Sequence, residues 1–72
     1  MNPKDELTIK KFGVNVKAYR KMKGLTLIQL AELVQVDYTT ISKIERGLIN
    51  TTVTMVARIA KALEVDEAKL FN

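Results

Sequence analysis

The sequence predicts an all-α fold, a compact arrangement of five short helices in one domain of 72 residues. Apolar residues recur at intervals of three and four along most of the chain, which is the spacing of one face of an α-helix. Hydroxyl or carboxylate residues, which favour helix N-termini, precede four of the five segments. No segment shows the alternation of apolar and polar residues that is typical of a half-buried strand.

Length and composition restrict the chemistry of the chain. A domain this short buries roughly 60% of the surface that its unfolded chain exposes, and 47% hydrophobic residues are enough for one core. The chain has no cysteine and no histidine, which excludes disulfides, thiolate metal sites and the commonest general base. Ser42 is the only serine. We therefore expect no enzymatic activity, no metal and no cofactor, and no small-molecule ligand is evident.

The N-terminal residues show no targeting signal. Residues 1–6 lack an apolar segment and are expected to form a flexible tail. No apolar run approaches the ~20 residues that span a membrane. We therefore expect a cytoplasmic protein without a membrane partner.

The first helix is expected from about residue 7 to residue 23. Four apolar residues form one stripe along it: Ile9, Phe12, Val16 and Tyr19. Gly13 lies in this helix at a cost of about 1 kcal/mol relative to alanine. It either permits close contact with another helix or has no structural role. Gly24 ends the helix.

Residues 26–47 are expected to form two short helices joined by a tight turn. Thr26 caps the first, over about 27–34, and Asp37 caps the second, over about 38–46. Such a turn usually needs a positive φ, so Gln35 is expected in the left-handed conformation at roughly 1 kcal/mol. The small Ala31 lets the two helices approach, and Gly47 ends the second.

The second helix of this pair has two faces. Ile41 and Ile44 are its only aliphatic residues, and they lie one turn apart. The remaining side chains are mostly polar: Tyr38, Thr39, Thr40, Ser42, Lys43 and Arg46. A short helix that packs against another and presents hydrogen-bonding side chains is how a helix-turn-helix recognises DNA.

Two further helices follow a loop over residues 48–52. Thr51 or Thr52 is expected to cap the fourth helix, which ends near Leu63. Its inward stripe is Val56, Ile59, Ala60 and Leu63. Asp66 caps a last short helix that ends near Phe71.

The positive charge is unevenly distributed. Residues 1–46 contain nine Lys/Arg and five Asp/Glu, whereas residues 47–72 contain three of each, so the whole excess of +4 lies in the N-terminal part. This suggests a polyanionic partner. A first helix whose lysines are merely solvated explains the excess equally well.

At specific positions the chain resembles the phage repressor/Cro-type (Xre-like) helix-turn-helix family. The segments that carry the resemblance are Leu25-Thr26, Leu30-Ala31, Val36, Ile41-Ser42, Ile44-Glu45-Arg46-Gly47 and Ile59-Ala60-Lys61-Ala62-Leu63. It extends from residue 12 to residue 71. Within the family, four features look like the controller proteins of restriction–modification systems: Phe12-Gly13, Asp37-Tyr38, Arg46-Gly47 with Asn50, and Leu70-Phe71.

The resemblance implies a repressor-like transcriptional regulator that places helix 38–46 in the major groove of double-stranded DNA. The matching positions imply base contacts from Tyr38, Thr39, Thr40, Ser42 and Lys43. They imply phosphate contacts from Thr26, Leu27, Ile28, Arg46 and Asn50. They also imply a structural ion pair between Arg20 and Glu45. A half-buried Tyr38 and merely solvated threonines are the alternatives.

Two residues depart from the family pattern. Leu27 stands where the family usually has a glutamine that helps to hold a phosphate, and Gln35 stands where it usually has glycine. Leu27 removes one polar side chain, but the backbone N–H groups at the start of the helix can still bind a phosphate.

One small domain covers too few base pairs for specific binding, so we expect a homodimer on a palindromic operator with half-sites about 34 Å apart. The neutral C-terminal part is expected to supply the interface, namely Ile49, Met55, Leu70 and Phe71. Alternatively, Leu70 and Phe71 only complete the monomer core. Two other functions remain open, an antitoxin-type protein that also binds a toxin and a helical interaction module that does not bind DNA.

Overall fold

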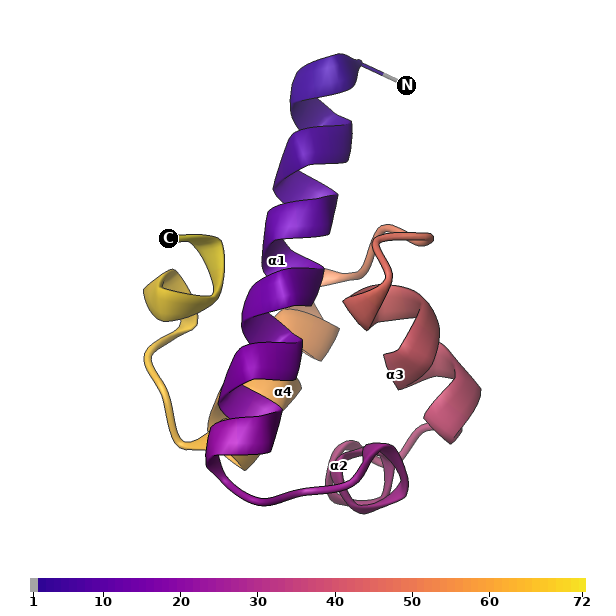
Figure 1. The fold of residues 1–72 in the computed structure, drawn as a ribbon, viewed down its shortest axis with the longest axis vertical. Helices are drawn as coiled ribbons and strands as arrows, with labels where there is room; N and C mark the ends of the chain where they lie inside the picture. The colour runs from indigo at the N-terminus through magenta and orange to yellow at the C-terminus, as the bar shows by residue number, and fades with distance from the viewer. Residues whose placement is uncertain (1) are drawn as a thin grey trace.

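The computed structural model describes residues 2–72, and within this range every regular element is helical (Figure 1). The elements, in chain order, are α1 (Pro3–Met22), α2 (Leu27–Val34), α3 (Tyr38–Glu45), α4 (Val53–Leu63) and η1 (Glu67–Phe71). The all-α class and the order of the five segments are confirmed. The fifth segment is a 3₁₀ helix, so the structure has four α-helices where five helices were expected.

α1 begins four residues earlier than the apolar pattern predicts, at Pro3. The side chain of Asn2 accepts a hydrogen bond from the Lys4 N–H at 2.9 Å, and proline suits the first helical position because its missing N–H needs no partner there. Asp5 and Glu6 lie in the first turn, where the helix dipole favours negative charge. Residues 3–6, expected in the tail, are therefore helical, and Met1 lies outside the described residues.

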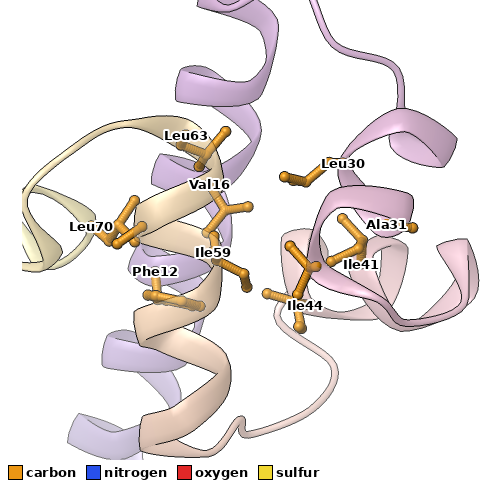
Figure 2. Close-up of a cluster of buried hydrophobic side chains, with 11 residues drawn as sticks. Phe12, Val16, Leu30, Ala31, Ile41, Ile44, Ile59, Leu63 and Leu70 are labelled. Atoms are coloured by element: carbon orange, nitrogen blue, oxygen red, sulfur yellow. The ribbon is translucent and has the colours of Figure 1, made fainter.

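One hydrophobic core connects all five elements (Figure 2). Its buried residues are Phe12, Val16, Leu30, Ala31, Val34, Ile41, Ile44, Ile59, Ala60, Leu63 and Leu70. The predicted stripes supply most of them. Ile9, Tyr19 and Val56 are only half-buried, at the margin of the core.

The C-terminal helix η1 packs against α1 and corrects one expected site. Leu70 is 0% exposed, so its side chain cannot contact a second subunit. It completes the monomer core, because a helix this short fills the gap between α1 and α4 with its single inward apolar residue. Phe71 is exposed, and its ring stacks on Phe12 with the centroids 5.1 Å apart. Asn15 fixes the segment by donating to the carbonyl oxygens of Leu70 and Asn72, each at 3.0 Å.

The helix ends largely follow the predicted capping. Gln35 has φ 66° and ψ 47°, so the left-handed turn residue is confirmed. Glu64 adopts the same conformation, with φ 58°, at the end of α4. Thr52, and not Thr51, caps α4, and Asp66 caps η1. Asp37 occupies the N-cap position of α3, but its side chain makes no capping hydrogen bond, so the predicted cap is present only in backbone conformation.

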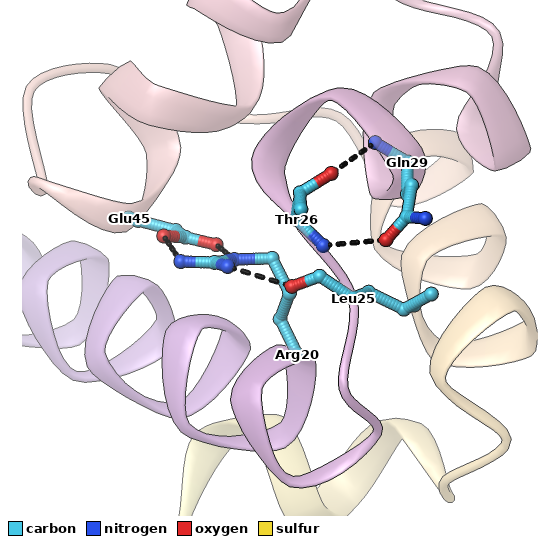
Figure 3. A network of polar contacts seen from close by, with 5 residues as sticks. All are labelled: Arg20, Leu25, Thr26, Gln29 and Glu45. Carbon is cyan, nitrogen blue, oxygen red and sulfur yellow. Dashed lines mark hydrogen bonds and ion pairs between the residues drawn. The ribbon is translucent and has the colours of Figure 1, made fainter.

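Arg20 links three segments from a buried position (Figure 3). Its Nε and Nη2 donate to the two carboxylate oxygens of Glu45 at 2.7 and 3.1 Å, and its Nη1 donates to the Leu25 carbonyl at 2.8 Å. Arg20 is 7% exposed and is the one buried charged residue in the described part of the chain. The end of α1 is thereby joined to the residue before α2 and to the last turn of α3.

α1 and α3 approach closely at Gly13. A Cβ atom at this position would collide with the Ile44 carbonyl oxygen and lie 2.8 Å from the Glu45 carbonyl oxygen. Of the two roles considered for Gly13, the structure selects the close helix contact. The contact lies beside the Arg20–Glu45 pair, so both fix the same end of α3.

A second ion pair, on the surface, joins α1 to the end of α4. Lys23 Nζ lies 2.9 Å from Glu64 Oε1. The hydrogen bond from Lys23, followed by the attraction of its charge, lowers the pKa of Glu64. Because solvent screens exposed pairs, this contact adds little stability.

Replacing Gly13 with alanine tests the close approach of α1 to α3. Alanine normally stabilises a helix relative to glycine by about 1 kcal/mol, but here the added methyl group overlaps backbone oxygens. Such overlap costs about 1–3 kcal/mol or more. We expect a lower midpoint in urea unfolding followed by circular dichroism. Val14→Ala, one residue away on the exposed side, is the control and should leave the midpoint nearly unchanged. A Gly13→Ala protein more stable than the wild type would contradict the packing.

Replacing Glu45 with alanine tests the buried ion pair. The change leaves the Arg20 charge buried without its partner, which typically costs about 3–5 kcal/mol. The free energy of unfolding of a domain of this size is little larger than this cost. We therefore expect a largely unfolded protein at 25 °C. Glu64→Ala, which breaks the exposed pair, is the matched control and should change the thermal midpoint little. A Glu45→Ala protein with the wild-type midpoint would show that the pair does not support the fold.

Candidate functional site

α3 divides into a buried face and an exposed face. Ile41 and Ile44 are buried against α1 and α2. Five residues on the opposite side, spaced by one turn or adjacent on the helix surface, form what we call the α3 surface: Tyr38, Thr39, Ser42, Lys43 and Arg46. Tyr38 is 54% exposed, so its ring does not belong to the core. Ser42 and Thr40 are half-buried, and Thr40 lies at the edge beside Ile44.

The α3 surface offers mainly hydrogen-bond donors and positive charge. Its hydroxyl groups can donate and accept, whereas the Lys43 ammonium and the Arg46 guanidinium only donate. Both cations lie at the C-terminal end of α3, where the helix dipole favours positive charge. Such a surface suits a partner that combines negative charge with hydrogen-bonding groups.

The start of α2 is organised by a capping box (Figure 3). The Gln29 N–H donates to Thr26 Oγ1 at 3.0 Å, and the Thr26 N–H donates to Gln29 Oε1 at 2.8 Å. Leu27 and Ile28 lie between these two residues. Their N–H groups are among the first four backbone N–H groups of an α-helix, which have no hydrogen-bond partner within the helix. Gln29 was not among the predicted residues, although the pattern Thr-x-x-Gln is a recognisable signature of this cap.

The turn between α2 and α3 fixes the angle of the helix pair. The N–H groups of Gln35 and Val36 donate to the carbonyls of Glu32 and Ala31 at 3.2 and 3.0 Å. These bonds close the end of α2 while Gln35 is left-handed. The buried Ala31 has no side chain beyond Cβ, which allows the close packing of α2 on α3. The two departures from the family pattern thus leave the backbone arrangement intact.

The loop after α3 places Asn50 and Arg46 on the surface. Gly47 reverses the chain with φ +69°, and the Leu48 N–H donates to the Lys43 carbonyl at 2.9 Å. The Asn50 side-chain oxygen accepts a hydrogen bond from the Thr51 N–H at 2.9 Å, which gives the loop a defined shape. The side chains of Arg46 and Asn50 are exposed.

The expected interface residues do not all meet. Ile49 and Phe71 line one apolar groove between α1 and the start of α4. We call it the apolar groove, and its other main apolar lining is Ile9, Phe12, Val53 and Val56. Met55 is half-buried and does not line it. Val53 was not among the predicted residues. It lies three residues before Val56, so spacing alone assigns it to the inward stripe, but it is 85% exposed because it precedes the part of α4 that the core covers.

A group of metal-ligating side chains and a membrane-spanning helix are both absent from the described residues. Among residues 2–72, no three His, Cys, Asp or Glu side chains are grouped so that they could hold a metal ion. No helix in this range is long and apolar enough to cross a membrane.

Comparison with known proteins gives concordant matches. A family model described as helix-turn-helix (HTH_3) matches residues 16–70. The HTH-type transcriptional regulator SlrR of Bacillus subtilis is 38% identical over 61 residues, which are 83% of this chain and 40% of SlrR. The chain thus spans about two fifths of the length of this curated relative.

Solved structures show the same fold. The restriction-modification controller protein C.AhdI from Aeromonas hydrophila has a TM-score of 0.84 and 32% identity, over 88% of this chain and 96% of that one. The wild-type controller protein C.Esp1396I has a TM-score of 0.80 and 36% identity, over 89% and 82% of the two chains. The relatives are named as regulators and not as enzymes. Because the family model covers most of the sequence and includes α2 and α3, the chain belongs to the helix-turn-helix family.

Proposed function

We propose that this protein is a sequence-specific DNA-binding transcriptional regulator that binds a palindromic operator as a homodimer. The observation that carries the proposal is the division of α3. Its two isoleucines are buried, which fixes the helix, and its polar side chains are exposed. A helix held in this way enters the major groove with its exposed side chains against the base edges.

The residues of the α3 surface other than Arg46 would supply the base contacts. Lys43 can donate to guanine O6 or N7, and the methyl group of Thr39 can contact a thymine methyl. Tyr38, at the start of α3, can hydrogen-bond a base or a phosphate or pack on a sugar. Ser42 and Thr40 are less exposed and would contribute at the margin of the contact.

The start of α2 and the end of α3 would bind phosphates. The N–H groups of Leu27 and Ile28 lie at a helix N-terminus, where the helix dipole favours an anion. In the capping box the Thr26 N–H already donates to Gln29, and the Thr26 hydroxyl oxygen already accepts from Gln29. Thr26 would therefore bond a phosphate by donating its hydroxyl proton. Arg46 and Asn50 would hold the phosphates on the far side of α3. These contacts position the protein without reading sequence.

The apolar groove would form the dimer interface. Ile49 and Phe71 line it, Val53 projects at its edge, and Met55 lies on the same helix as Val53. Two copies joined here would present two α3 surfaces to successive turns of the major groove. Because dimer formation depends on concentration, occupation of the operator would rise steeply with the amount of protein.

A narrower role follows from two of the structural relatives. C.AhdI and C.Esp1396I are named as restriction-modification controller proteins, and each matches this chain over most of its length with more than 30% identity. We propose that this chain has a controller role of the same type.

Selection of bound fragments from a random DNA pool tests the proposed function. We expect palindromic sequences whose half-sites lie about 10 base pairs apart, centre to centre. On the selected operator, Lys43→Ala should lose affinity by about 1–3 kcal/mol and tolerate other bases at one position of each half-site. Arg46→Ala, the matched phosphate variant, should weaken binding to all sequences and lower the salt slope by about one.

Two results would contradict DNA recognition by α3. One is binding that does not weaken as salt rises, because phosphate contacts release counterions. The other is a Lys43→Ala protein with unchanged sequence preference. Absence of any DNA binding would favour the interaction module without DNA binding.

Val53→Lys tests the dimer. The side chain is 85% exposed, so the change should not affect the fold of the monomer. It would place a charge in each half of an apolar interface, and we expect sedimentation to show a monomer at concentrations where the wild type is a dimer. Leu33→Lys, an exposed leucine on α2, is the control and should remain dimeric. A wild-type monomer at high micromolar concentration with operator DNA would exclude the dimer.

A further inference from the structure

The outer face of α1 carries a line of apolar side chains with no partner in the described structure. Leu7, Val14 and Met22 are 67%, 64% and 79% exposed, and the exposed Ala18 lies between the last two. Their spacing of seven, four and four residues places them along one side of the helix, where Lys11 occupies the turn between Leu7 and Val14. We call these four residues the α1 seam.

The contacts of α1 show that the α1 seam is separate from the surfaces already described. Gly13 faces α3, and Phe12 and Val16 enter the core. Asn15 faces η1 on the other side through its hydrogen bonds to Leu70 and Asn72. By helical spacing the α1 seam lies on the side of α1 away from the buried Phe12 and Val16. The N-terminal part of α1 extends beyond the other helices (Figure 1).

Positive charge lies along one side of the α1 seam and within it. By helical spacing, Lys10, Lys17 and Lys21 follow one side, Lys11 lies in the line between Leu7 and Val14, and Lys4 lies one turn before Leu7. All five lysines are exposed. Within residues 2–72, none of these lysines forms an ion pair. From residue 7 to residue 23 the sequence has no aspartate or glutamate. Asp5 and Glu6 lie just before the seam, and from residue 7 onward the charges on α1 are all positive, which favours an acidic partner.

We propose that the α1 seam binds an acidic amphipathic helix of a partner protein. The apolar line spans about 22 Å, the length of four helical turns. A line this narrow matches the apolar stripe of a second helix, and the lysines beside it and within it match glutamates or aspartates that flank such a stripe.

Three other occupants fit less well. DNA phosphates would pair with the lysines but would leave Leu7, Val14 and Met22 uncovered. Helices that lie on membranes bury a broad apolar face rich in aromatic or leucine side chains, whereas the α1 seam is narrow and has no aromatic residue.

A second copy of this chain also fits less well. α4 has no acidic residue, and the acid of α3, Glu45, is paired with Arg20. The acids of α1, Asp5 and Glu6, lie only in its first turn, and α2 has one acid, Glu32, in a helix of eight residues.

Titration of the ¹⁵N-labelled 72-residue protein with a designed peptide tests the proposal. The probe is a four-turn helical peptide with a leucine stripe flanked by glutamates, and the control peptide has lysines in place of the glutamates. We expect the glutamate peptide to shift the amide signals of residues 7–22 on the outer side of α1 and to leave α3 unchanged. Raised salt should weaken binding, since the attraction is screened within about 3 Å at 1 M.

Val14→Asp is the decisive variant. It removes an apolar contact and adds a repelling charge, so the affinity for the glutamate peptide should fall at least about tenfold. Lys17→Glu, which lies beside the apolar line and leaves it unchanged, should weaken binding through charge alone. Leu33→Asp, on α2, is the matched control and should bind the peptide as the wild type does. Circular dichroism checks that all three variants fold.

Several results would overturn the inference. One is that the lysine peptide binds as tightly as the glutamate peptide. Another is that the peptide shifts amide signals of the α3 surface or the apolar groove instead of α1. A third is that the glutamate peptide does not bind at about 1 mM, a concentration that detects even weak complexes. Val14-dependent binding to vesicles of anionic phospholipid without peptide binding would assign the seam to membranes. A loss of operator affinity in Val14→Asp as large as in Lys43→Ala would assign it to DNA.

Discussion

The arrangement of the helix pair depends on the buried guanidinium of Arg20. It holds the carboxylate of Glu45 with two hydrogen bonds and the carbonyl of Leu25 with a third. One side chain of α1 therefore sets where α2 begins and where α3 ends. A buried ion pair contributes little net stability, because desolvation offsets the attraction. Its effect is on geometry, since the donors of one side chain bond two other segments at the same time.

The contact at Gly13, like the Arg20 network, fixes the position of α3 relative to α1. Backbone oxygens of Ile44 and Glu45 lie where a side chain at this position would begin, so α1 and α3 lie closer than side chains would normally allow. With one face of α3 packed this tightly, its other face is free to carry polar residues that contribute little to stability. The sequence of the α3 surface can then vary with the proposed operator without loss of the fold.

Local chemistry was sufficient to predict much of the structure. Thr26, Gly47 and Asp66 mark helix boundaries through short-range hydrogen bonding or backbone conformation, and the left-handed Gln35 followed from the needs of the turn. The predicted start of α1 was wrong, because the prediction followed the apolar stripe. Asn2 and Pro3 mark the true boundary by capping, and no apolar stripe begins there. Asp37 was placed correctly, but the orientation of its carboxylate depends on surroundings that the sequence pattern does not specify.

The sequence by itself determined the all-α class, the helix pair, the inward stripes and the family, because each depends on spacing along the chain. Only the tertiary structure decided that Leu70 belongs to the core, that Ile49, Val53 and Phe71 share a groove, and that the outer side of α1 has no partner within the described residues. Spacing gives the face of a helix on which a residue lies. Whether that face is covered depends on where the other helices pack, and long-range contacts such as those of Asn15 and Arg20 fix that packing.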